Sequence, residues 1–125
     1  MKHLLDVNVL LAAIWQQHPD FPKADAWLAG RQVATCPLSE LGFLRVSTAP
    51  KALNADMAAS RQLLQAFLVK HKAEFIPADL PALKSSARRS DGVTDLYLAE
   101  LASSKGMKLA TFDTHIKHAA VQVIK

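Results

Sequence analysis

Five short apolar runs, separated by segments with helical patterns, constrain the fold of this chain more than any other feature. The runs cover residues 3–7, 33–36, 74–77, 109–112 and 121–124. Short, mostly apolar strands are typical of a parallel sheet that is buried on both faces. Because helical segments separate the runs, the pattern predicts an α/β fold: a short, mainly parallel central sheet with helices on both of its faces.

The segments between the strands carry the spacing and the end residues of helices. Apolar residues at three- and four-residue spacing predict an amphipathic helix over 56–72. Pro37 is placed to open a helix over 38–46, and Thr94 is the N-cap candidate of a helix over 94–105. We also expect helices over 8–17, 23–29 and 79–88 with Asp79 as cap, a break at 18–22, a turn at 89–92 and one helical turn over 114–118.

Length and composition predict one globular domain over 1–125. The chain has 125 residues, of which 50% are hydrophobic and 21% charged, without repeats or a linker. Its single cysteine, Cys36, excludes an internal disulfide and a cysteine-based zinc cage, and it is expected in the core. Asp6 and Asn8 interrupt the apolar N-terminal stretch, and no window reaches the roughly 18 apolar residues of a membrane span. We therefore expect a soluble, cytoplasmic protein.

Four acidic residues occupy places where ligands collect in a fold of this kind. Asp6 and Asp113 each follow or end a predicted strand, Glu40 lies in the first turn after the second strand, and Asp95 lies at the start of a helix. In an open parallel sheet the carboxyl ends of the strands line one edge, and ligands bind there where the strand order reverses. We expect the four carboxylates to converge on one pocket.

A pocket of carboxylates has a chemical reason to bind metal. Mg²⁺ and Mn²⁺ prefer carboxylate oxygens, lower the pKa of a bound water and neutralise charge on a phosphate during its displacement. Without metal, such carboxylates repel one another. Taken singly, Glu40, Asp95 and Asp113 are also compatible with ordinary helix or turn positions, which a carboxylate stabilises by about 0.3–1 kcal/mol. Asp6 is harder to explain in this way, because burying it unpaired among apolar neighbours would cost several kcal/mol.

The charge of the chain fits a polyanionic substrate. Lys and Arg number 15 against 11 Asp and Glu, and the sequence pI is about 9.4. If four acids share one site, the remaining surface is strongly basic, which suits a nucleic acid. Arg45, Lys84, Arg88 and Arg89 lie near the acids in sequence and are candidate contacts to RNA phosphates, although solvated surface positions explain each of them equally well.

Four segments resemble the acidic motifs of PIN-domain proteins, in the same order and across nearly the whole chain. Residues 4–12 (LLDVNVLLA) resemble the opening motif and residues 37–46 (PLSELGFLRV) the second. Residues 94–102 (TDLYLAELA) and 109–113 (LATFD) resemble the third and fourth. The compact size resembles that of the toxins of VapBC-type toxin–antitoxin modules.

The resemblance implies an α/β/α sandwich and a metal-dependent endoribonuclease. It implies that Asp6, Glu40, Asp95 and Asp113 are catalytic and hold Mg²⁺ or Mn²⁺. Asn8 and Thr111 stand where the family often keeps polar residues that support the site. The implied partners are an RNA substrate, a separately encoded antitoxin and a second copy in a homodimer. All four acids are present, which argues against a non-catalytic member.

Other function classes remain open at this stage. A catalytically silent PIN-like domain that binds RNA or protein would share the fold. A receiver-like signalling module would need an adjacent acidic pair after the first strand, and a phosphomonoesterase of the haloacid-dehalogenase type would need an aspartate in place of Asn8. Neither pattern is present. Of the histidines, His115 could contact a phosphate or water beside Asp113, while His3 and His118 have no assigned role.

Overall fold

The five predicted strands form one parallel sheet in the computed structural model, which describes residues 1–125. The strands are β1 (His3–Leu5), β2 (Val33–Thr35), β3 (Glu74–Phe75), β4 (Lys108–Thr111) and β5 (Val121–Val123). Their order is β3-β2-β1-β4-β5, and every neighbouring pair is parallel. The prediction of a short parallel sheet is confirmed; β4 is shifted by one residue from its apolar run, and the other four strands are shorter than theirs.

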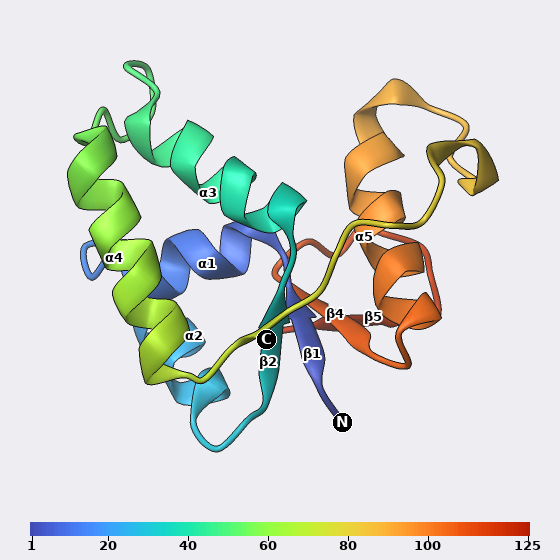
Figure 1. Ribbon diagram of the computed structural model, residues 1–125, viewed down its shortest axis with the longest axis horizontal. Helices are drawn as coiled ribbons and strands as arrows, with labels where there is room; N and C mark the ends of the chain where they lie inside the picture. Colours follow the sequence, from blue (N-terminus) through green and yellow to red (C-terminus); the bar gives the residue numbers. More distant parts are fainter.

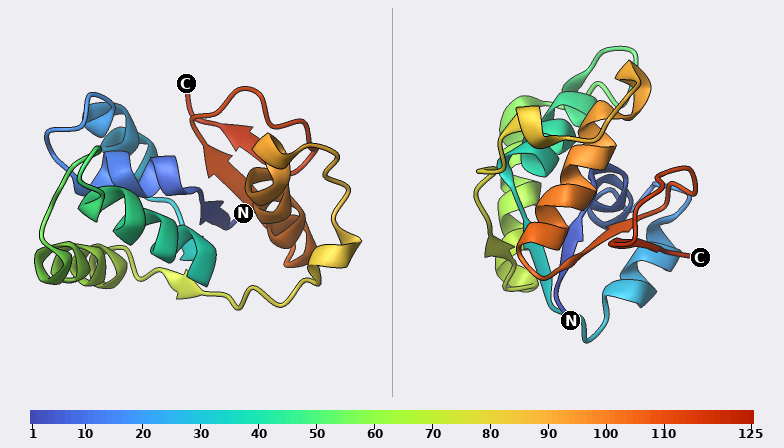
Figure 2. Two further views of the ribbon diagram at one scale, coloured as in Figure 1. Left: turned by 90° about the horizontal axis from the view of Figure 1, so that it is seen from above. Right: turned by 90° about the vertical axis from the view of Figure 1, so that its right-hand side faces the viewer.

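Helices cover both faces of the sheet, as predicted. They are α1 (Val7–Ile14), α2 (Phe21–Leu28), α3 (Pro37–Thr48), α4 (Met57–Lys70) and α5 (Val93–Ser104). Figure 1 shows α1 to α4 on one side of the strands and α5 on the other, and the view from above in Figure 2 shows the same separation. The fold is therefore a three-layer α/β/α sandwich. No helix has the length and apolar character that crossing a membrane requires.

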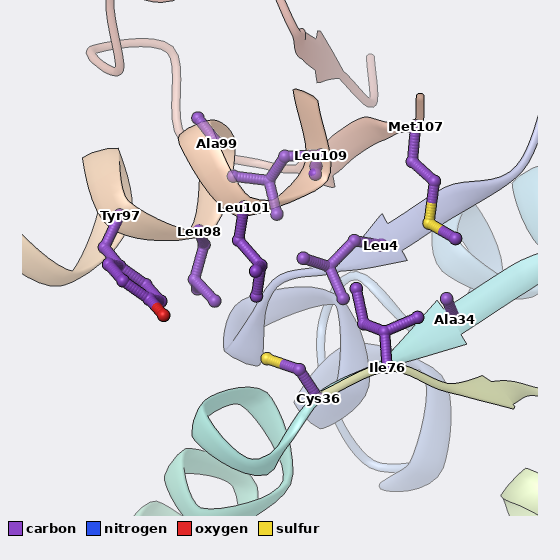
Figure 3. Close-up of a cluster of buried hydrophobic side chains, with 11 residues drawn as sticks. Leu4, Ala34, Cys36, Ile76, Tyr97, Leu98, Ala99, Leu101, Met107 and Leu109 are labelled. Atoms are coloured by element: carbon purple, nitrogen blue, oxygen red, sulfur yellow. The ribbon is translucent and has the colours of Figure 1, made fainter. Parts of the chain in front are cut away.

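Successive strand residues point to opposite faces of the sheet, which gives the molecule two hydrophobic cores. Leu4 and Leu109 pack against Leu98 and Leu101 of α5, in the cluster that Figure 3 shows. Their neighbours in sequence, such as Leu5, pack instead with residues of α1, α3 and α4. Cys36 is fully buried in the α5 core with a free thiol, as expected.

The order of the strands reverses at β1. From β1 the chain builds outward through β2 to β3, and it then returns to the other side of β1 for β4 and β5. Leu5 pairs with Ala110 across the β1–β4 junction, and the amide of Asp6 donates a hydrogen bond of 3.0 Å to the Ala110 carbonyl. The carboxyl ends of β1 and β4 thus form the switch point at which α/β folds bind ligands.

The prediction of a helix over 79–88 is wrong. Only Ala82–Lys84 forms a short 3₁₀ turn, and no side chain of the segment is buried. The backbone of the segment bonds to α5 instead, because the carbonyl of Leu80 accepts a hydrogen bond of 2.8 Å from the hydroxyl of Tyr97. Asp79 does not cap a helix; its carboxylate pairs with Lys105 of the α5 end at 2.9 Å.

The predicted helical turn over 114–118 is also absent. The carboxylate of Asp113 accepts a hydrogen bond from the amide of His115 at 2.7 Å. Nδ1 of His118 accepts one from the amide of Ala120 at 3.0 Å. Such side-chain bonds to the backbone compete with helical hydrogen bonds and hold the segment in an irregular conformation.

Four helices, α1, α2, α3 and α5, begin one or two residues earlier than predicted, and α2 and α5 show why. The helix α2 starts at Phe21, and Pro22 lies in its first turn, where the missing proline amide has no helical partner to lose. The helix α5 starts at Val93 because the 3₁₀ turn Ser90–Gly92 leads directly into it, with Gly92 in the N-cap position. The assignment of Thr94 as N-cap is therefore wrong.

A glycine sets the spacing of the two helices that flank the switch point. A Cβ atom built on Gly42 of α3 would lie 2.4 Å from Cγ2 of Val7, in the first turn of α1. Real Cβ atoms do not approach other atoms so closely, so the present distance between α1 and α3 requires glycine at this position. This contact matters for function because α1 follows Asp6 and α3 carries Glu40.

We predict that Gly42→Ala destabilises the protein by about 1–3 kcal/mol, the usual penalty for overpacking. In a Val7→Ala background the added methyl group has room, and the same substitution should be neutral or stabilising by up to about 1 kcal/mol because alanine favours the helix. Urea unfolding of the four proteins of this cycle measures the difference. Equal losses in both backgrounds would contradict the close contact.

Candidate active site

Asp6 is the most deeply buried acidic residue of the chain. Asp6 lies directly after β1 and is only 4% exposed to solvent. The hydroxyl of Thr111, at the end of β4, donates to Oδ2 at 2.8 Å, and the amide of Val7 donates to Oδ1 at 2.7 Å. The second bond makes Asp6 the N-cap of α1. Burial raises the pKa of Asp6, the two hydrogen bonds oppose the rise, and the negative charge of Asp113 adds to it.

Asn8 and Thr111 connect Asp6 to the segment that carries Asp113. The side-chain amide of Asn8 donates to Oγ1 of Thr111 at 3.1 Å and accepts from the amide of Phe112 at 3.2 Å. The Thr111 hydroxyl oxygen also accepts from the amide of Asp113 at 3.0 Å. The end of β4 is thereby fixed to the start of α1.

Asp95 and Asp113 face a common cavity of about 720 Å³. Asp95 comes from the first turn of α5, and Asp113 follows β4. Partial burial raises the pKa of Asp95, and the charges of Asp6 and Asp113 raise it further. Three acids that are distant in sequence therefore lie within electrostatic reach of one another, as the sequence predicts.

Glu40 is held one strand further along the same edge. Its Oε2 accepts a hydrogen bond of 2.7 Å from the hydroxyl of Thr35, the last residue of β2. Glu40 is not among the charges that raise the pKa of Asp6 or Asp95. The expectation that all four carboxylates share one pocket is therefore not met: Asp95 and Asp113 line the cavity, Asp6 acts on them electrostatically from its buried position, and Glu40 lies at the neighbouring strand.

Thr35 is a residue that the sequence analysis missed. It is buried at the end of β2 and bonds to Glu40, just as the buried Thr111 at the end of β4 bonds to Asp6. A threonine in the last strand position before a candidate acid is a pattern that could have identified it.

None of the three acids Asp6, Glu40 and Asp95 forms an ion pair, and Asp113 has only the His115 ring, with Nδ1 at 3.3 Å. No three acidic, histidine or cysteine side chains lie close enough together to surround a cation directly. Mg²⁺ usually binds through one or two carboxylates and several waters. The hard oxygen donors Asp95 and Asp113 line an open cavity and have no Lys or Arg partner, and they fit a hydrated cation of that kind.

Comparison with known proteins identifies the family. The model of the PIN domain family matches residues 3–122 of the chain. This chain belongs to the PIN-domain family. The match confirms the resemblance in the acidic motifs, and it leaves no support for a receiver-like module or a phosphomonoesterase of the haloacid-dehalogenase type.

This PIN domain is similar to several curated ribonucleases of Mycobacterium tuberculosis. It is 35% identical to Ribonuclease VapC38 over 95% of this chain and 90% of that protein. It is 34% identical to Ribonuclease VapC44 over 97% of this chain and 92% of that protein. It is 31% identical to Ribonuclease VapC39 over 96% of this chain and 94% of that protein.

A solved structure shares the fold. It is the crystal structure of VapBC2 from Rickettsia felis bound to a DNA fragment from their promoter, with a TM-score of 0.61. The match covers 92% of this PIN domain and 90% of that chain at 17% identity. It agrees with the three-layer fold.

The basic residues proposed from sequence separate into two groups in the PIN domain. Arg88 and Arg89 line the cavity that Asp95 and Asp113 face. The lining of this cavity does not include Lys84, which lies in the preceding 3₁₀ turn, or Arg45, which is exposed on α3.

Three residues that follow Asp113 line the same cavity, namely His115, Ile116 and Lys117, and of these only His115 was a candidate from the sequence. His118 is committed to the backbone of Ala120. His3 is buried at the start of β1, at the opposite end of the strand from Asp6, with its ring edge-on to Trp27 at 5.0 Å between centroids. His3 is therefore not part of this site.

We predict that Asp6→Asn gains stability relative to the wild type as pH rises. The pKa of Asp6 is raised in the folded state above its ordinary value of 3.8. Between these two pKa values the folded state binds more protons than the unfolded state, so the wild-type protein loses stability as pH rises through this range, and the Asn variant has no such loss. Asn has one acceptor oxygen fewer than Asp, which changes the free energy of unfolding by an amount that does not depend on pH. The test is therefore how the stability difference between the two proteins changes with pH. Urea unfolding in EDTA from about pH 3.5 to 7 measures it.

Gln62→Ala, on the exposed face of α4, is the control: it changes no titratable group and should show a difference that does not vary with pH. A parallel response of both variants would contradict the burial of an uncompensated carboxylate at Asp6.

Proposed function

We propose that this PIN domain is a Mg²⁺- or Mn²⁺-dependent endoribonuclease and the toxin of a toxin–antitoxin module. The observation that carries the proposal is the group Asp6, Asp95 and Asp113, three mutually repelling carboxylates without a Lys or Arg partner at the switch point of the sheet. The relatives at 31–35% identity are named ribonucleases, which supports RNA as the substrate.

Asp95 and Asp113 are the residues that would hold the cation, because both line the cavity and neither is saturated by hydrogen bonds. Asp6 is buried and adds its charge from below the surface, while Glu40, in the first turn of α3, is held beside the end of β2 by Thr35. When bound, Mg²⁺ or Mn²⁺ supplies an activated water and neutralises charge on the phosphate.

The chain's own residues contribute orientation. The hydroxyl of Thr111 donates to the carboxylate of Asp6, and its oxygen accepts a hydrogen bond from the backbone amide of Asp113. Thr111 therefore fixes the position of Asp6 relative to the backbone that carries Asp113. Thr35 fixes Glu40 in the same way. Such supporting contacts usually change metal affinity or activity by 10- to 100-fold.

Partner proteins are part of the proposal. The solved structure with the same fold is that of a VapBC2 protein pair, and the curated relatives carry VapC names. We extend to this chain an antitoxin that is encoded separately, and a homodimer. Large apolar side chains exposed on the surface, Leu41, Leu83 and Val69, suit protein contacts. The free Cys36 suits a reducing cytoplasm.

A catalytically silent domain that binds RNA or protein is the second candidate. It is favoured by the finding that no three donors gather around one point. The retention of all four acids favours catalysis, and an activity assay separates the two.

We predict that the purified protein cleaves RNA with Mg²⁺ or Mn²⁺ and that excess EDTA abolishes cleavage. Asp95→Asn should lower the rate by more than about 100-fold, beyond the usual loss from a supporting contact, because it removes a cation ligand. Gel analysis of cellular RNA measures the cleavage, and circular dichroism checks that the variant is folded. The exposed Asp25→Asn should retain full activity. Cleavage that persists in EDTA would contradict the metal mechanism.

Thr35→Val keeps the shape of the side chain and removes its hydrogen bond to Glu40. We expect about a 10- to 100-fold loss of cleavage, the range for residues that orient a ligand or catalytic group. Cleavage rates at saturating metal measure it, with Thr48→Val on the C-terminal turn of α3 as the control. Unchanged activity would mean that Glu40 needs no such support.

A further inference from the structure

The cavity in front of the carboxylates has two basic walls. One wall is the segment 87–92, which leads into α5 and carries Arg88 and Arg89. The other is the segment 113–117, which follows β4 and carries Lys117. Asp95 and Asp113 belong to the same cavity lining.

The second wall has a defined conformation although it is not helical. The carboxylate of Asp113 binds the amide of His115 at one end, and the ring of His118 binds the amide of Ala120 at the other. Between them Ile116 is partly buried and packs on the hydrophobic core beneath α5. The residues on either side of this anchor, His115 and Lys117, are exposed and line the cavity.

The cations of the two walls differ in their partners. Arg89 pairs with Asp91 of its own wall, 3.3 Å away, so these two charges compensate each other. Arg88 and Lys117 form no ion pair and no side-chain hydrogen bond within the protein. Each wall therefore presents one unpaired cation beside Asp95 and Asp113. A cation that a protein leaves unpaired on a concave surface is available to an anionic ligand.

We propose that Lys117 and Arg88 bind the backbone phosphates on the two sides of the phosphate that is cleaved. The RNA strand then crosses the cavity from one wall to the other, with its reacting phosphate at Asp95 and Asp113. Phosphate contacts of this kind set the register of a nucleic acid without reading its sequence. Lys117 is thus a positioning residue for the substrate, and this inference rests on the proposed function.

The test is RNA binding, because binding does not require cleavage. Fluorescence anisotropy of a short, labelled single-stranded RNA of mixed sequence is measured on the Asp95→Asn protein at several salt concentrations. Adding Lys117→Gln should weaken binding about fivefold at about 0.1 M salt and reduce the slope of log affinity against log salt by about 0.7, the value for one phosphate contact to a single strand. Arg88→Gln should act alike, and the double variant should lose both contributions.

Two control variants distinguish a local contact from net charge. Lys51→Gln removes an exposed lysine beyond the end of α3, outside the cavity, and should leave the slope unchanged. Lys117→Arg retains the charge and should retain the slope. In cleavage assays of the protein with Asp95 intact, Lys117→Gln should raise KM about fivefold and leave kcat within about twofold, as loss of a uniform binding contact does.

The outcomes separate this inference from the proposed function. RNA binding with the predicted slopes but without cleavage under any metal supports the two walls and refutes the nuclease. Cleavage with equal slopes for Lys117→Gln and Lys51→Gln overturns the inference and leaves the nuclease standing. Absence of RNA binding by the wild-type protein overturns both.

Discussion

Burial of the Asp6 carboxylate is the constraint on which the rest of the site depends. An ionised carboxylate without a counter-charge opposes folding when it leaves water, and Asp6 has two hydrogen bonds and no cation in compensation. One donor comes from its own helix and the other from β4, more than a hundred residues later in sequence. The carboxylate therefore joins the start of α1 to the end of β4 and makes their junction a fixed polar point between two apolar cores.

Asp95 and Asp113 add to the electrostatic cost of burying Asp6. Asp95 and Asp113 raise the electrostatic free energy of the folded chain, because like charges that lie close together repel one another. A structural role would be served equally well by neutral residues at these positions. Asp6 and Asp113 accept hydrogen bonds from a threonine hydroxyl or from backbone amides, and Asp95 lines the cavity beside Asp113; this is the arrangement of a site that is completed by a cation. The close approach of α1 and α3 at Gly42 brings Glu40 to the same edge.

The incorrect helix predictions lie next to this site, and they have a common cause. Over 79–88 the Leu80 carbonyl and the Ser86 amide bind side chains of α5, and over 114–118 the side chains of Asp113 and His118 bind nearby backbone amides. Both segments remain irregular and form or lead to the walls of the cavity. Irregular backbone held by specific side-chain bonds allows charged residues from separate parts of the chain to face one cavity, which regular helices there would not.

The sequence by itself determined the strand positions, the α/β class, the four acids and the family, because apolar runs, helical spacing and motif order are properties of neighbouring residues. Only the tertiary structure decided that Asp6, Asp95 and Asp113 are coupled while Glu40 is held toward Thr35, and that Lys117 shares a cavity with Arg88. Those relations depend on which strands pair and on where irregular segments turn. Both are set by contacts between residues far apart in the chain, which no local pattern encodes.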